Sequence, residues 1–514
     1  MVKKVYLLLL IVLCMLPVSA MTVKAENSII ENDETGIPDK VLYKRILHIL
    51  KKDKNEKFTR KEAESVENLY TTSIDNVVTF RGIGCLKNLK KLDCEGINNE
   101  ELEEIAEELP GLKWLIVRGY NEETYSSVVP AIESRKKQID SLKPLENMNN
   151  LAGLSVSNNN LTSLDGIAGL KKLKRLKAEN NQIADTEQAK GLKSLKELYL
   201  SGNQLTNLNG INNLKKLTYL DASNNNLTSL GGIGKLEKLE KLRLSGNHLS
   251  GVKGIKKLKN LKELYLDDNN MKKIGEIGQI KNLTKLYMNG NQMTGVKGIG
   301  KLKNLQLLSL NDNCLTKLGE ITQLKKLERL YLSKNKIKTL SDSDLKSLKK
   351  LRSLVLYDNE LKELPGKKSL KKLKYVDFNW NYLTEEEIKK KLKKVYWEGH
   401  SLCRWTWEEQ KTGIQVTYLS PDQKTGITKD TKEIVGKIMP GTIKGYSPDF
   451  YLLLPDGKMY GWDGKNYNAS AADENGVFRI DGLDLREYAG KEVKLILMLD
   501  YAWKINIDRF VVQE

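Results

Sequence analysis

Apolar and polar positions follow a repeating unit of 22 residues through the middle of the chain. Eleven times between Leu151 and Leu383 the sequence reads L-x-x-L-x-L-x-x-N-x-L, and nine of the ten intervals between the asparagines are 22 residues long. Within each unit, apolar residues alternate over a short stretch such as 198–200, which predicts a short strand with inward-pointing leucines. One unit cannot bury its own apolar face, so the pattern predicts a solenoid of stacked units with a parallel sheet on its concave side.

The asparagine of each unit lies where the strand ends. There the backbone leaves the sheet with unpaired amides and carbonyls, and a carboxamide offers both donors and acceptors to them. We therefore expect these framework asparagines to be structural. They are Asn159, Asn181, Asn203, Asn225, Asn247, Asn269, Asn291, Asn313, Asn335, Asn359 and Asn381.

Helix signals flank the repeats and predict caps that cover the first and last units. Ile37-Pro38-Asp39 precedes a segment whose apolar residues fall on one helical face. Thr59 with Glu62, and Thr384 with Glu387, have the spacing of capping boxes at helix N-termini. A solenoid needs such caps because its end repeats would otherwise expose an apolar edge to water.

Two irregularities interrupt the pattern. Before the regular array, two units lack the framework asparagine, and a helix is predicted between them over 100–109. Around 341–344 a two-residue insertion predicts that a connecting turn becomes a longer, helical one.

The leucine periodicity ends near Trp397. Turn signals such as Pro455-Asp456-Gly457 then separate short apolar runs, which predicts a small all-β sandwich of jelly-roll or immunoglobulin-like type. The predicted fold class is α/β, a repeat solenoid followed by this sandwich. Its parts are a signal peptide (1–25), an N-terminal helical cap (26–80), the repeat array (81–383), a C-terminal helical cap (384–397) and the β-sandwich (398–514).

The first residues are typical of a secretory signal peptide. Lys3 and Lys4 precede an apolar run over 5–18, and small residues predict cleavage after Ala20 or Ala25. No other stretch approaches the roughly 18 apolar residues of a spanning helix, and no sorting pentapeptide follows. We therefore expect a secreted, extracellular protein without a transmembrane anchor, either released or held non-covalently at the cell surface.

Residues with catalytic or metal-binding chemistry are few and scattered. Three histidines lie in different regions, and no nucleophile motif or phosphate-binding loop is present, so we expect neither an enzyme nor a cofactor or metal site. The cysteines Cys85, Cys94, Cys314 and Cys403 have no disulfide or metal-ligand spacing. Cys94 occupies a core position and is predicted to be a buried free thiol rather than half of a bridge to Cys85.

The chain is basic, with 85 Lys and Arg against 66 Asp and Glu and a formal net charge of +19. The lysines crowd the segments between strands, which predicts a solvated outer face. The alternative is a loose, salt-sensitive attraction to an anionic cell wall. At the concave positions basic and acidic residues nearly balance, so a nucleic-acid partner is not expected.

The concave face carries the candidate binding residues. Between the buried leucines, the third, fifth, seventh, eighth and tenth positions of each motif point outward, and aromatic residues recur there. Tyr is favoured at interfaces, although it can also simply stack on cross-strand neighbours. The predicted contact residues are Tyr199, Tyr219, Arg243, Tyr265, Asp267, Tyr287, Tyr331, Tyr357, Tyr375 and Trp380.

Two charged patches of opposite sign lie beside these aromatics. Lys241 and Arg243 belong to one repeat, and Glu263, Asp267 and Asp268 belong to the next. The sequence predicts that each patch meets opposite charge on a partner.

The array resembles the internalin-like class of extracellular bacterial leucine-rich repeat proteins. The likeness rests on the 22-residue period, on Gly-Ile before the next leucine, as at Gly166-Ile167, on segments such as Asn203-Gln204-Leu205-Thr206, and on the Ile37-Pro38-Asp39 cap. It implies a protein partner on the concave sheet, in adhesion or recognition. Separately, we expect the chain to be a monomer.

The C-terminal domain supports a different hypothesis. Residues 483–512 resemble the last strands of galactose-binding jelly-roll modules, and Tyr460, Trp462 and Tyr467 near predicted turns are suited to stacking on a sugar ring or to filling the core. The alternative function is therefore glycan or cell-wall binding by this domain, with the repeats as a scaffold. Inhibition of a secreted enzyme is a third class, for which the sequence has no distinctive mark.

Overall fold

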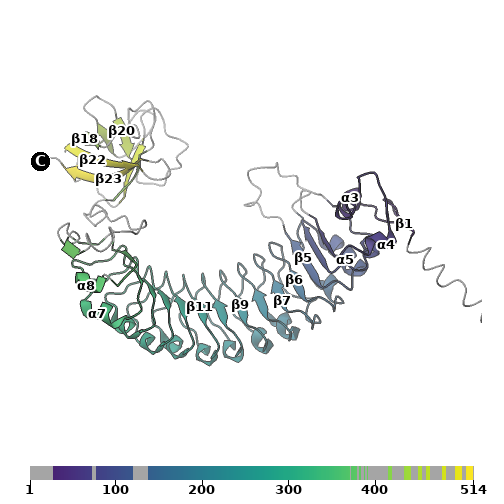
Figure 1. The fold of residues 1–514 in the computed structure, drawn as a ribbon, viewed down its shortest axis with the longest axis horizontal. Coiled ribbons are helices and arrows are strands. Elements are labelled where there is room, and N and C mark those ends of the chain that lie inside the picture. The colour runs from purple at the N-terminus through teal and green to yellow at the C-terminus, as the bar shows by residue number, and fades with distance from the viewer. Residues whose placement is uncertain are drawn as a thin grey trace, which may run out of the picture. The chain divides into compact units, whose positions relative to one another are not determined.

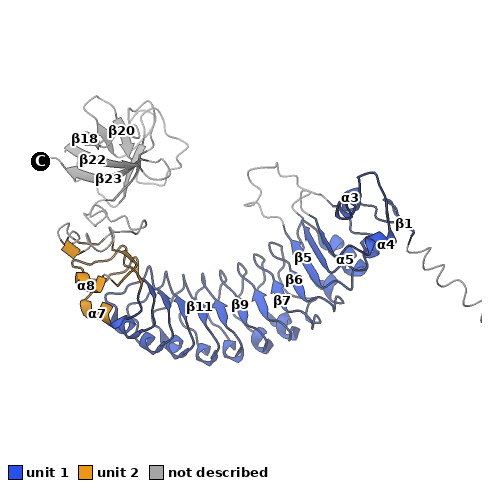
Figure 2. Cartoon of the chain, in the orientation of Figure 1, with its two compact units in different colours: residues 1–331, 347–351 blue, residues 332–346, 352–514 orange. Residues whose placement is uncertain are grey.

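The computed structural model describes residues 27–71, 77–119, 137–370, 372–378, 381–383, 387 and 390–391, together with the backbone of seven C-terminal strands. The predicted signal peptide and most of the second capping-box helix lie outside the described residues. The chain divides into two compact units, 1–331 with 347–351, and 332–346 with 352–514 (Figure 2). Among the described residues, no helix is both long enough and apolar enough to cross a bilayer.

The first unit is a solenoid with one short strand in each repeat. Its parallel sheet follows the chain order from β3 to β14, along the inner side of the curve, with the turns on the outer side (Figure 1). The strands are β3 (Asn68–Tyr70), β4 (Lys91–Glu95), β5 (Trp114–Arg118), β6 (Gly153–Ser155), β7 (Arg175–Lys177), β8 (Glu197–Tyr199), β9 (Tyr219–Asp221), β10 (Lys241–Arg243), β11 (Glu263–Tyr265), β12 (Lys285–Tyr287), β13 (Leu307–Ser309) and β14 (Arg329–Tyr331).

Short 3-10 helices of three or five residues form most of the outer side, because a repeat of 22 residues leaves little room for a longer helix. They are η1 (Ile83–Cys85), η3 (Lys143–Leu145), η4 (Glu187–Gly191), η5 (Ile211–Asn213), η6 (Ile233–Lys235), η7 (Ile255–Lys257), η8 (Gly275–Gln279), η9 (Ile299–Lys301) and η10 (Gly319–Gln323).

Equivalent positions of successive repeats face one another in this sheet. Leu198 lies opposite Leu220, and Leu242 lies opposite Leu264. All four leucines are fully buried, and each contributes about 1.5 to 3 kcal/mol by leaving water. The same register aligns the residues on either side of each leucine, so every exposed strand position forms a column of side chains across the sheet.

The framework asparagines tie each repeat to its neighbour. Asn225 Oδ1 accepts from the Leu205 amide at 2.9 Å, and its Nδ2 donates to the carbonyls of Leu200 at 2.9 Å and Ser223 at 3.0 Å. The same pattern recurs at Asn203 and Asn247, and each framework asparagine is at most 8% exposed. Their predicted structural role is confirmed.

A helical cap covers the first repeat. Strands β1 (Ile29–Ile30) and β2 (Phe58–Thr59) form an antiparallel pair beside the helices α3 (Lys40–Ile49) and α4 (Arg60–Ala63). Asp39 caps α3 through the Leu42 amide at 2.8 Å and also accepts from the Val78 amide at 2.8 Å, which ties the cap to the following segment. The predicted capping box of Thr59 and Glu62 is present at the start of α4.

The predicted irregularities are also helical in the structure. The helix α5 (Asn99–Glu108) lies between β4 and β5, and α7 (Asp342–Ser347) forms at the two-residue insertion. In the second unit, α8 (Lys367–Leu370) lies between the paired strands β15 (Ser353–Val355) and β16 (Tyr375–Asp377).

The C-terminal segment is described as strand backbone. Its strands pair in the closed order β17-β21-β20-β19-β18-β22-β23. The predicted β-sandwich stays a prediction, because the side chains that would form its core lie outside the description. The strands are β17 (Gln415–Leu419), β18 (Glu433–Pro440), β19 (Phe450–Leu453), β20 (Met459–Trp462), β21 (Val477–Asp481), β22 (Glu492–Leu499) and β23 (Ile505–Val512).

The described cysteines are free thiols. Cys94 is fully buried in β4, and neither Cys85 nor Cys314 forms a disulfide. Burial raises the pKa of the Cys94 thiol above its usual range, and it raises the pKa of Cys85 to about 11. The prediction of a buried free thiol at Cys94 is confirmed, and both thiols are protonated at neutral pH.

Candidate functional site on the concave face

The strands place the predicted contact residues on the open face of the sheet. In β8, Leu198 is buried, whereas Glu197 and Tyr199 on either side of it are half-buried. The third and fifth positions of each repeat therefore line the concave face. Tyr199, Tyr219, Arg243, Tyr265, Tyr287 and Tyr331 all lie on strands of the first unit, and Asp267 follows β11. Tyr357 and Tyr375 belong to the second unit, and Trp380, Tyr467 and the side chains of Tyr460 and Trp462 lie outside the description.

Four of the tyrosines form two ring pairs, one stacked and one tilted. The rings of Tyr265 and Tyr287, direct cross-strand partners on β11 and β12, lie 4.6 Å apart between centroids and are inclined by 5°. Tyr199 and Tyr219 lie on the diagonal between β8 and β9, with centroids 4.6 Å apart and an angle of 32°. Such pairs add about 0.5 to 1.5 kcal/mol beyond area burial, so the rings are held in place before any partner arrives.

Two cations on β10 connect the two pairs. Lys241 Nζ lies 5.8 Å from the Tyr219 ring centroid and 5.2 Å from that of Tyr265. The Arg243 guanidinium carbon lies 4.6 Å from the Tyr265 centroid. Both are cation–π distances. We call Tyr199, Tyr219, Lys241, Arg243, Tyr265 and Tyr287 the central aromatic patch.

Carboxylates from neighbouring repeats neutralise these cations. Glu263 pairs with Lys241 at 3.1 Å and with Lys285 at 2.7 Å, and it accepts the Tyr265 hydroxyl at 3.0 Å. Asp221 pairs with Arg243 at 3.2 Å. The prediction of two separate charged patches is therefore wrong at Lys241, Arg243 and Glu263. The register places opposite charges side by side, and they compensate one another within the sheet.

The central aromatic patch shifts the pKa values of its own groups. Burial, followed by the hydrogen bond to Glu263, raises the pKa of Tyr265 to about 12, and burial also raises the pKa of Tyr219. Burial alone would raise the pKa of Glu263, but the hydrogen bonds from Lys285, Lys241 and Tyr265 outweigh it and lower that pKa to about 2. At neutral pH Glu263 is ionised and the tyrosines are neutral.

Glu263→Gln is expected to remove a pH-dependent part of the stability. The folded pKa of about 2 lies below the ordinary value of 4.5, so the stabilisation is full above pH 4.5 and is lost as the pH falls through 2. After allowance for solvent screening we expect a loss of about 1 to 2 kcal/mol at pH 7, which shrinks toward pH 2. Urea unfolding at pH 7, 4.5 and 3 measures it. The exposed-residue control Glu328→Gln should match wild type, and a pH-independent difference for Glu263→Gln would contradict the assignment.

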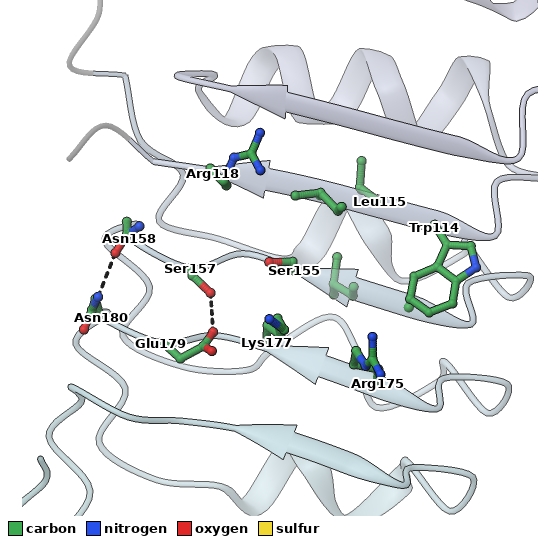
Figure 3. A pocket seen from close by; sticks show the side chains of 13 residues that line it. Trp114, Leu115, Arg118, Ser155, Ser157, Asn158, Arg175, Lys177, Glu179 and Asn180 are labelled. Carbon is green, nitrogen blue, oxygen red and sulfur yellow. Dashed lines mark hydrogen bonds between the residues drawn. The ribbon is translucent and has the colours of Figure 1, made fainter. Parts of the chain in front are cut away.

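A pocket with a volume of about 460 Å³ opens on the same face, across β5, β6 and β7 (Figure 3). We call it the Trp114 pocket. Hydrogen bonds from Ser157 to Glu179, and from Asn180 to Asn158 at 2.8 Å, organise one side of it. Its lining residues are Trp114, Leu115, Ile116, Arg118, Gly153, Leu154, Ser155, Ser157, Asn158, Arg175, Lys177, Glu179 and Asn180.

Gly153 creates the space that the Trp114 ring occupies. The two residues are cross-strand partners, and a Cβ at Gly153 would lie 2.0 Å from two carbons of the indole ring. Sequence reasoning missed this pocket because β5 belongs to a repeat without the framework asparagine. The sequence did hold one signal: Gly153 occupies the third position of its motif, and Trp114 occupies the third position of the preceding repeat.

The described residues show no arrangement suited to metal chemistry. Among them, no group of three His, Cys, Asp or Glu side chains is placed to hold a metal ion. The chemistry of the concave face is that of aromatic stacking, ion pairs and hydrogen bonds.

Comparisons with known proteins bear on the fold. The family described as "Leucine Rich repeats (2 copies)" matches residues 149–191, 171–213, 193–235, 215–257, 237–279, 259–301 and 303–347. A leucine-rich repeat protein of Leptospira interrogans is 33% identical, over 64% of this chain and 89% of that one, with a TM-score of 0.52. The chain belongs to the leucine-rich repeat proteins.

Other solved leucine-rich repeat structures are similar to this one. An internalin of Listeria monocytogenes is 21% identical over 66% of this chain and 95% of that one, with a TM-score of 0.48. The functional domain of InlJ from the same species is 14% identical over 89% of this chain and 99% of that one, with a TM-score of 0.47. No curated protein matches the chain.

Proposed function

We propose that this leucine-rich repeat protein is a secreted, non-enzymatic recognition protein that binds a protein partner on its concave face. The observation that carries the proposal is the central aromatic patch, in which paired tyrosine rings and interleaved cations occupy the consecutive strands β8 to β12. Tyrosine and arginine are the residue types that most often dominate the energy of protein interfaces.

The internal ion pairs favour a protein partner over a strongly charged ligand. Because Lys241 and Arg243 already pair with Glu263 and Asp221, the patch presents aromatic surface without a large net charge. A partner therefore covers rings of fixed geometry and does not have to supply a countercharge. Preorganised side chains lose little conformational entropy on binding, which raises affinity.

The extent of the sheet fits a partner of domain size. Neighbouring strands lie about 4.8 Å apart, so β7 to β14 alone extend for about 34 Å. A stable protein interface buries about 800 Å² on each partner, and this face is long enough to supply it.

Capture of surface proteins on the immobilised full chain tests the proposal. Wild type is compared with a variant in which Tyr199, Tyr265, Tyr287 and Tyr331 become alanine, and cross-linked proteins are identified by mass spectrometry. We expect one protein to be retained by wild type and lost from the variant.

A matched variant examines the basic outer face in the same experiment. In it the exposed lysines Lys172, Lys259, Lys281 and Lys303 become alanine. This variant should retain the partner. Retention by the tyrosine variant together with loss from the lysine variant would instead support attraction of the outer face to anionic surfaces.

A further inference from the structure

The Trp114 pocket adjoins the central aromatic patch, where Lys177 Nζ lies 4.9 Å from the Tyr199 ring centroid, but its chemistry is different. We propose that it binds a saccharide unit that carries a carboxylate. The central aromatic patch presents paired tyrosine rings, whereas this pocket combines one indole with hydroxyl, amide and guanidinium groups around a hollow.

Trp114 supplies the platform for the sugar ring. Its ring lies over Gly153, where no side chain separates it from the sheet, and the residue is 38% exposed. One face of the indole is therefore backed by the strand, and Figure 3 shows the ring at one end of the pocket. The C–H face of a pyranose packs on such an aromatic surface, since the indole has a large apolar area and a negative π-face.

Hydrogen-bonding groups line the pocket together with the apolar residues Leu115, Ile116 and Leu154. Ser155 and Ser157 project from β6 and the residues after it, and Asn158 and Asn180 lie beside them (Figure 3). Hydroxyl and carboxamide groups act as donors and acceptors at once. Vicinal sugar hydroxyls require that combination, and the apolar C–H face of the ring suits the indole beside it.

The pocket lining contains three cations, Arg118, Arg175 and Lys177. Whether each already pairs with a carboxylate of the protein indicates the charge of the ligand. Arg118 pairs with Asp93 at 2.8 Å, and Arg175 pairs with Glu197 at 2.7 Å. Lys177 Nζ lies 4.9 Å from the Tyr199 ring centroid, and within the described part of the chain it forms no ion pair with a carboxylate. Lys177 is thus the cation available to a ligand, whereas the one carboxylate of the lining, Glu179, accepts a hydrogen bond from Ser157. A carboxylate on the sugar is the group that complements Lys177.

The size of the pocket agrees with this ligand class. Its volume of about 460 Å³ lies within the range of about 300 to 1,000 Å³ for small-molecule sites, which is room for one or two sugar residues.

A glycan microarray of acidic and neutral oligosaccharides, probed with the full chain, tests the proposal. Uronate- and sialate-bearing glycans should be retained by wild type, and their carboxyl-reduced forms should bind at least tenfold more weakly. Trp114→Ala and Lys177→Met should each weaken retention at least tenfold, whereas the exposed-lysine control Lys172→Met should not change it.

Gly153→Ala is a second, independent variant. It keeps the tryptophan but places a methyl group where the ring lies, so the indole must move off the sheet. We expect the same tenfold loss of acidic glycans together with a changed tryptophan fluorescence and an unchanged circular dichroism spectrum.

The outcomes separate this site from the protein-binding face. A variant with only Tyr265 and Tyr287 changed to alanine keeps Tyr199 beside Lys177 and should retain acidic glycans, so failure of one proposal leaves the other standing. Retention of no acidic glycan by wild type, equal retention by the Trp114, Lys177 and Gly153 variants, or preference for an acidic hexapeptide on the same array would overturn the saccharide assignment.

Discussion

Asn225→Ala is expected to lower the free energy of unfolding by about 1 to 3 kcal/mol, because it removes a buried, hydrogen-bonded carboxamide. The Asn225 side chain is 5% exposed and bonds to Leu205, Leu200 and Ser223 across two repeats. Alanine leaves the buried Leu205 amide without its partner, which costs about 1 to 3 kcal/mol. The carbonyls of Leu200 and Ser223 each lose one donor but keep another, Asn203 Nδ2 at 3.0 Å and the Gly202 amide at 3.0 Å. Urea unfolding followed by circular dichroism measures the change.

The neighbouring residue provides the control. Asn226 has the same side chain one position further on, but it is exposed. Asn226→Ala should therefore change the free energy of unfolding by less than about 0.5 kcal/mol. Equal effects at the two positions would show that the framework hydrogen bonds do not hold the repeats together.

Tyr265→Ala and Tyr287→Ala are each expected to raise the Kd of the captured partner by about tenfold to a hundredfold. Interface residues of this type contribute about 1.4 to 2.8 kcal/mol when they are central and well packed. Removal of either ring also frees the other, since the two stack at 4.6 Å, and Tyr265 positions Glu263 through its hydroxyl. Surface plasmon resonance with each single variant measures the effect.

The double variant distinguishes a joint role from two separate ones. Because the rings are in contact, the loss in Tyr265→Ala with Tyr287→Ala should be smaller than the sum of the single losses in free energy. Tyr70→Ala, at an exposed tyrosine on β3, is the control and should leave the Kd unchanged. Unchanged Kd values in both single variants would remove the central aromatic patch from the interface.

The regular part of the fold was predictable because the same leucine packing and the same asparagine hydrogen bonds recur every 22 residues. Leucine spacing determined which side of each strand is buried, and the position of Asn225 at the strand end required the hydrogen bonds that the structure shows. Capping chemistry is similarly local, and the Thr59–Glu62 box follows from two residues three positions apart.

The details of the concave face depend on neighbouring repeats and were predicted less well. The exposed positions of Tyr265 and Arg243 follow from strand alternation, but their pairing follows from the register between strands. The sequence placed Lys241 and Glu263 in different repeats and therefore suggested separate patches, whereas the parallel register makes them direct partners.

The Trp114 pocket could not be predicted from the repeat motif. Trp114 and Gly153 are 39 positions apart along the sequence, and an irregular segment lies between them, so the 22-residue spacing does not align them. Only the paired strands show that the glycine accommodates the indole.

Lysine footprinting of the full chain with and without its partner tests the central claim most directly. Lys241 and Lys285 on the concave face are 32% and 38% exposed, so acetylation can report on them, and Lys172, Lys259 and Lys281 on the outer side serve as internal references. We predict that the partner protects Lys241 and Lys285 from acetylation and leaves the outer lysines unchanged. Protection of the outer lysines with full reactivity at Lys241 and Lys285 would contradict recognition by the concave face.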